Sequence, residues 1–190
     1  MPKIKEMNQT RSNIFIGIAL IVLAAILKVA AYYNVLTISP IIAIALFSGA
    51  VIKDKKLAFI IPLLAMFIAD CLMEVFKVGQ GFYGFGQIAN YICLLAVALL
   101  GSAMRKISVL SVIGFSLGST LLFFFLSNSA VFLFDDFNMY ENTVNGYVKC
   151  MAAGLAFLKP QTFINDLLWS GVLFGSYVLY FKPSGKKVIA

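Results

Sequence analysis

The sequence predicts an all-α membrane protein, a single bundle of six transmembrane helices. Of its 190 residues, 62% are hydrophobic, and the mean hydropathy is +0.96, whereas soluble domains are about 45–50% apolar. Apolar runs recur along the whole chain, and basic residues gather in alternate connections between them. These observations together favour a polytopic membrane protein that forms one domain over residues 1–190.

The first span is expected at residues 14–33. Basic residues precede this run, and Val29-Ala30-Ala31 resembles a cleavage site, so a signal peptide is the alternative. A signal peptide has a shorter apolar core, whereas this run has the 20 residues that a membrane crossing needs. We therefore expect a retained first helix.

The other spans follow the remaining apolar runs. Pro40 falls in the first turn of the second run, where a helix tolerates proline. The pairs Ala45/Gly49 and Ala65/Ala69 have the four-residue spacing of closely packed helices. The expected spans are 38–52, 57–76, 87–104, 107–126 and 161–181.

Residues 127–160 mix apolar pieces with a polar stretch and are too long for a simple turn. They are expected to form one or two short helices, either an extracytoplasmic cap or a re-entrant segment. The glycine-rich stretch KVGQGFYGFG (77–86) lacks the ending of a phosphate loop. It is read as a lid over a binding site or as a plain connector.

Loop charges orient the six-span arrangement. With an even number of spans both termini share a side, and that side holds eleven of the fifteen basic residues. The positive-inside rule then places both termini in the cytoplasm of a bacterium, with the protein in the plasma (inner) membrane. The net charge of +7 is thus explained by membrane topology, and no nucleic-acid partner is expected.

Ionisable side chains inside the spans mark the candidate site. Asp70 and Glu74 lie one helical turn apart, with Cβ atoms about 6 Å from each other. Lys28 and Asp166 are expected at the same outer depth in other spans. A carboxylate in hydrocarbon costs at least ~2.5–3.5 kcal/mol, so these groups should face protein or water. They predict a cup open to the outside, and structural ion pairs between Lys28 and Asp70 or Asp166 are the alternative.

Amides and aromatic side chains expected near these charges complete the predicted site, since aromatics with polar tips often line ligand pockets. The predicted ligand-binding residues are Lys28, Asp70, Glu74, Tyr83, Asn90, Tyr91, Asn128, Tyr140, Asp166 and Trp169.

The sequence lacks the residues that a histidine-based metal site or a histidine-containing catalytic triad needs. The chain has no histidine, and Cys71, Cys93 and Cys150 form no CxxC pair, so these cysteines are expected to be small buried residues. No catalytic residues, metal site or cofactor are predicted, and the protein is not expected to be an enzyme. Two other classes stay open: a membrane-embedded enzyme that modifies lipid, and a structural subunit without a ligand.

Four stretches carry a family resemblance: SPIIAIALFSGA (39–50), PLLAMFIAD (62–70), FFFLSNSAVF (123–132) and the long run 139–175. They resemble a family of small uncharacterised bacterial membrane proteins. That family is more loosely similar to the S components of energy-coupling-factor (ECF) vitamin transporters and to solitary vitamin B12 transporters. Two features depart from those transporters: the first span has no clean AxxxA stripe, and GQGFYGFGQ lacks a cysteine.

The resemblance implies what such a bundle would do. An S component binds a micronutrient in an outward-facing cavity and works with a transmembrane subunit and ATPase subunits. We therefore expect a substrate-binding subunit, or a small solitary transporter, for the uptake of a vitamin-like solute. Its expected partners are the solute, membrane lipid and, in the first case, the ECF-type subunits.

Overall fold

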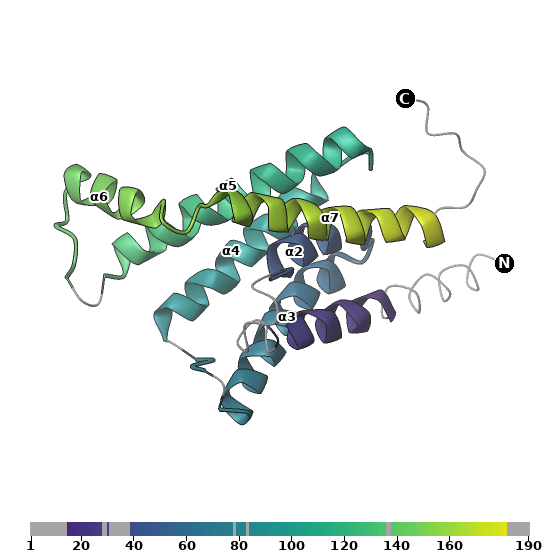
Figure 1. Cartoon of the computed structure of the whole chain (residues 1–190), viewed down its shortest axis with the longest axis horizontal. Helices are drawn as coiled ribbons and strands as arrows, with labels where there is room; N and C mark the ends of the chain where they lie inside the picture. The colour runs from purple at the N-terminus through teal and green to yellow at the C-terminus, as the bar shows by residue number, and fades with distance from the viewer. Residues whose placement is uncertain are drawn as a thin grey trace.

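A short, buried helix lies at the centre of the protein. The computed structural model (Figure 1) describes residues 15–27, 30, 39–77, 79–82, 84–135 and 138–181, and these residues form helices and no strand. A helix at Phe15–Leu27 precedes six labelled helices. These are α2 (Ile41–Val51), α3 (Lys55–Val75), α4 (Phe85–Ser102), α5 (Val109–Leu133), α6 (Val144–Gly154) and α7 (Pro160–Phe181).

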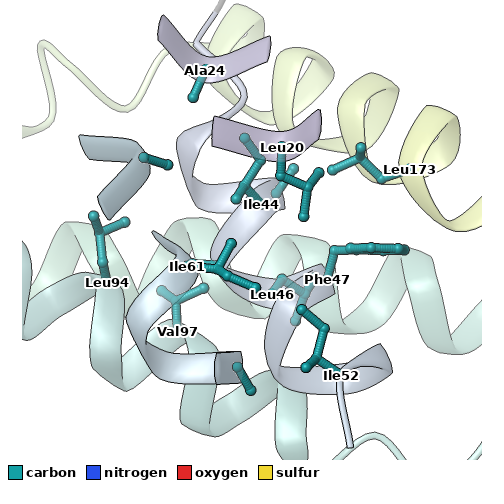
Figure 2. Packing of buried hydrophobic residues seen from close by; sticks show 14 of the residues in the cluster. Leu20, Ala24, Ile44, Leu46, Phe47, Ile52, Ile61, Leu94, Val97 and Leu173 are labelled. Carbon is teal, nitrogen blue, oxygen red and sulfur yellow. The ribbon is translucent and has the colours of Figure 1, made fainter. Parts of the chain in front are cut away.

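The central helix is α2, which packs against α3, α4, α5 and α7. Every residue from Ala43 to Gly49 is buried, as expected for a helix that is apolar on all sides. Figure 2 shows Ile44, Leu46 and Phe47 of α2 among buried side chains from the surrounding helices. The core therefore surrounds α2 and does not lie on one side of it.

The prediction of six spans is confirmed only in part. Within the part of the chain that the structure describes, three helices are long and apolar enough to cross a membrane: α3, α4 and α5. They match the spans predicted at 57–76, 87–104 and 107–126. The helix Phe15–Leu27 and α2 are apolar but shorter. At about 1.5 Å per residue the 11 residues of α2 extend only about 16 Å, roughly half the hydrocarbon thickness. The predicted span 161–181 corresponds to α7, which is not among the three.

Small residues bring α2 and α4 into backbone contact, as the Ala45/Gly49 spacing predicts. A Cβ atom on Gly49 would overlap the carbonyl group of Ala98, and one on Gly101 would overlap that of Leu46. Ala65 and Ala69 of α3 are also buried. This close approach is possible because Gly49 and Gly101, which face the carbonyl groups of the partner helix, have no side chain.

The segment predicted as a cap contains one short helix. Its first part, residues 127–133, continues α5, and α6 follows after a loop. The Thr143 hydroxyl caps α6 by accepting a hydrogen bond from the Gly146 N–H. In Figure 1, α6 and α7 follow one another along α5, and both pack against it. The prediction of a short helix between the fifth and sixth predicted spans is confirmed.

Candidate functional site

Asp70 lies in a buried hydrogen-bonded group where α3 meets α4. Its carboxyl group is completely buried, and Gln87 Nε2 donates to Asp70 Oδ2 at 2.8 Å. The Tyr91 hydroxyl donates to the same oxygen at 3.3 Å and accepts from Gln87 Nε2 at 2.9 Å. Gln87 and Tyr91 are four residues apart on α4, so they share a face that meets α3. The Gln87 and Tyr91 side chains hold the carboxyl group in a defined position, and the three residues form the Asp70 group.

Glu74 positions the loop that follows α3. Its Oε1 accepts hydrogen bonds from the backbone N–H groups of Gly81, at 2.8 Å, and Phe82, at 3.2 Å. The Phe82 ring packs edge-on against Phe67 of α3, with centroids 6.0 Å apart. Gly81 is buried so close to Asp70 that a Cβ atom there would overlap the Asp70 carbonyl oxygen. Gly81 and Phe82 therefore fold back onto α3, and Gly81 lies beside Asp70.

A second buried polar group joins α5 to α7. The Thr120 hydroxyl oxygen lies 2.7 Å from Asp166 Oδ2, and the Ser170 hydroxyl donates to that of Ser116 at 3.1 Å. Asp166 is only 2% exposed, and the three hydroxyl residues are equally buried. The pairs Ser116/Thr120 and Asp166/Ser170 each span one helical turn. Two polar contacts, one turn apart, therefore connect α5 to α7.

Two polar atoms on α7 are buried without a hydrogen-bond partner among the described residues: Asn165 Oδ1 and Trp169 Nε1. One is an acceptor and the other a donor. Asn165 donates from Nδ2 to the Ser39 carbonyl at 2.8 Å, which ties α7 to the start of α2. Buried polar groups are nearly always satisfied, so these two atoms mark a place for a ligand or an ordered water.

Asn128 and Tyr140 lie in the packing between α5 and α6. Asn128 Nδ2 donates to the Phe124 carbonyl of its own helix, and Gly154 of α6 packs directly against the Asn128 amide. The Tyr140 N–H donates to Asp135 Oδ2 at 2.7 Å. Cys150 is buried here, and burial, followed by the nearby Asp135 carboxylate, raises the pKa of its thiol.

The predicted site residues thus fall into three groups of contacts. Asp70, Glu74 and Tyr91 belong to the α3–α4 group, Asp166 and Trp169 to α7, and Asn128 and Tyr140 to the α5–α6 packing. Asn90 is half-buried on α4, while Lys28 and Tyr83 lie outside the described residues. Within the described ranges no three Asp, Glu or Cys side chains gather as a metal-binding group. The meeting of all ten residues in one cup stays a prediction.

Sequence reasoning missed several polar residues that contact the predicted ones or that join α5 to α7 beside them. The omitted residues are Gln87, Ser116, Thr120, Asn165 and Ser170. A spacing signal was available, because Gln87 precedes Tyr91 by four residues and the two α5–α7 pairs have the same spacing. Ser and Thr are common in membrane helices, so spacing alone could not separate these positions from ordinary small residues.

A cavity of about 480 Å³ lies between the start of α5 and the second half of α7. Its lining is almost entirely apolar and includes Val112, Leu167, Gly171, Phe174 and Val178. None of the predicted site residues lines it. It therefore offers a charged or polar solute no recognition group beyond the Ser108 hydroxyl.

Comparisons with known proteins place the chain at the level of a family. A protein-family model described as "Family of unknown function (DUF6580)" matches residues 8–187. No curated protein and no solved structure matches the chain. The expected membership of an uncharacterised family is confirmed.

Proposed function

The chain belongs to DUF6580, a family of unknown function, and we propose that it is a membrane protein that binds a small vitamin-like solute and takes part in its uptake. The proposal keeps both forms that the resemblance to S components implies: a substrate-binding subunit with ATPase partners, or a solitary transporter. It includes six crossings of the bacterial plasma membrane with both termini in the cytoplasm, on the loop-charge argument.

The observation that carries the proposal is the unsatisfied pair on α7. Asn165 Oδ1 and Trp169 Nε1 are buried without partners among the described residues. Their four-residue spacing puts them on one face of the helix. A solute that presents an N–H donor next to a carbonyl acceptor, as an amide or a ring lactam does, would satisfy both atoms. Each satisfied atom would recover a desolvation cost of about 1–3 kcal/mol.

The Asp70 group supports the same reading. Asp70 is fully buried in α3, a helix apolar enough to cross a membrane, and ionisable residues in such helices are expensive to keep. Gly81 of the following loop packs against the Asp70 backbone carbonyl, and the Glu74 carboxylate holds that loop in place. A carboxyl group held by an amide and a phenol beside a short loop is a suitable recognition element for a polar solute.

The test is a thermal-stability screen of the purified protein against vitamins and metal ions. A solute at 100 times its Kd adds about 2.7 kcal/mol of stability, which raises the unfolding temperature measurably. Trp169→Phe removes the N–H donor and keeps an aromatic ring, and Asp70→Asn removes the carboxylate. Both substitutions are expected to weaken the effect of a stabilising solute.

The matched control is Ser102→Ala, at the far end of α4 from Gln87, where the Ser102 hydroxyl bonds only the Leu99 carbonyl of its own turn. It should keep the full stabilisation. A solute whose effect is the same in Trp169→Phe, Asp70→Asn and the native protein would refute the assigned site. Failure of every solute, together with a native mass spectrum free of any retained small molecule, would favour a structural subunit.

A further inference from the structure

Among the described residues, no basic side chain of the helices packed around Asp166 faces its carboxyl group. Its helix, α7, packs against α2 and α5, and neither α2 nor α5 contains any Asp, Glu, Lys, Arg, Cys or Tyr. The helix Phe15–Leu27 contains none either. On α7 itself the nearest titratable group is Tyr177, three turns further along. An ionised carboxylate so placed would be a buried, unpaired charge, and buried groups avoid that state by neutralising.

The contacts of Thr120 indicate how the group is neutralised. The Thr120 hydroxyl oxygen lies 2.7 Å from Asp166 Oδ2 and 3.1 Å from the Ser116 carbonyl oxygen. A hydroxyl has one proton, so it cannot donate fully to a carboxylate and to a carbonyl at once. Both contacts are hydrogen bonds when Asp166 carries the proton. Asp166 then donates to Thr120, and Thr120 donates to the Ser116 carbonyl, as Thr residues in helices commonly do.

The other carboxyl oxygen fits the same state. Asn165 Nδ2 donates to Asp166 Oδ1 at 3.4 Å, so Oδ1 is the acceptor and Oδ2 is the oxygen that carries the proton. A bound metal cation fits poorly at this position. Ca²⁺ holds its oxygen ligands about 2.3–2.6 Å away and Mg²⁺ about 2.0–2.1 Å away, so two neighbouring ligands of either ion stand farther apart than the 2.7 Å between Thr120 and Asp166.

We propose that Asp166, with Thr120 as its hydrogen-bond acceptor, is a reversible proton-binding site within the helix bundle. The carboxylate takes a proton from water, an O–H bond forms on Oδ2, and no other bond changes. The site stands on the α5–α7 contacts and does not need the proposed solute. With a solute bound at Asn165 and Trp169, which rests on the proposed function, the proton would lie on the residue next to the solute.

The test is infrared spectroscopy of the full chain in detergent, with no solute added. A protonated carboxyl group has a carbonyl-stretch band that a carboxylate lacks. At neutral pH we expect such a band in the native protein, its loss in Asp166→Asn and its persistence in Asp54→Asn, whose carboxylate only caps α3. The band should disappear at alkaline pH and return on neutralisation. Thr120→Val should shift the band, because the acceptor of the Asp166 O–H is removed.

Three outcomes would overturn the proposal: no Asp166-dependent band at neutral pH, a band unmoved in Thr120→Val, or a band that sodium ions remove at constant pH. Asn resembles the protonated acid in shape and in its N–H donor, so the Asp166 variant is expected to fold. If the Asp166 variant does not fold, the shift of the carboxyl band in Thr120→Val tests the proposal instead. A failed solute screen leaves this measurement unaffected, so the two proposals fail separately.

Discussion

Gly49 of α2 lies directly against the backbone carbonyl of Ala98 on α4, leaving no room for a Cβ atom on Gly49. Gly101 of α4 makes the reciprocal contact with the Leu46 carbonyl. The two helices therefore meet backbone to backbone at two points. This contact holds the central helix α2 against α4, the helix that carries Gln87 and Tyr91 of the Asp70 group.

Gly49→Ala is expected to destabilise the protein. The added methyl group overlaps backbone atoms that cannot rotate away, and overpacking of this kind costs about 1–3 kcal/mol. Gly114→Ala is the matched control, because a Cβ atom at Gly114 meets nothing within 4 Å. That control should be neutral or slightly stabilising. Denaturant unfolding in detergent measures both, and equal stabilities of the two variants would contradict the close contact.

Gln87→Leu is expected to lower stability by about 1–3 kcal/mol, because the fully buried Asp70 carboxyl group loses the amide donor that lies 2.8 Å from it. Tyr91→Phe should cost less, since the Tyr91 hydroxyl is 3.3 Å from Asp70. Gln161→Leu makes the same change at an exposed position of α7 and serves as the control. Thermal unfolding compares the three, and a Gln87 variant no less stable than the Gln161 variant would exclude a tight Asp70 group.

Glu74→Ala is expected to loosen the loop after α3. Two backbone N–H groups, those of Gly81 and Phe82, lose their acceptor. A loss of about 1 kcal/mol of local stability corresponds to roughly fivefold faster amide exchange at these two residues. Glu141→Ala, at an exposed position before α6, should leave their exchange unchanged. Hydrogen exchange followed by mass spectrometry measures the amide protection of this loop. Unchanged protection in the Glu74 variant would show that Glu74 does not hold the loop in place.

Cys150 is expected to react slowly with alkylating reagents in the folded protein. The thiol is buried, and burial followed by the Asp135 carboxylate raises its pKa, so less of the reactive thiolate exists at neutral pH. The rate should rise as the pH is raised, because the thiolate then forms. A variant with Cys71 and Cys93 replaced by serine isolates this thiol, and its detergent-unfolded form is the control. Equal labelling rates in the two forms would show that Cys150 is accessible.

The sequence by itself determined the helical class of the protein. Long apolar runs require backbone groups to be satisfied within helices, so an all-helical fold with helices apolar enough to cross a membrane followed from composition and length. Local spacing also predicted the small-residue contact at Ala45/Gly49 and the short helix between the fifth and sixth predicted spans. Asp70, Glu74 and Asp166 were recognisable because a charge in an apolar run is rare and expensive.

Only the tertiary structure decided what each of these residues contacts. Glu74 binds a loop, Asn128 packs against α6, and Asp166 meets Thr120, whose position in the sequence is 46 residues away. The tertiary structure also placed α2 at the centre of the bundle, whereas the sequence predicted only an ordinary span at residues 38–52. The physical reason is that hydropathy and periodicity act within a helix, whereas partners across an interface depend on how two helices are rotated and aligned. That alignment is set by the packing of the whole bundle.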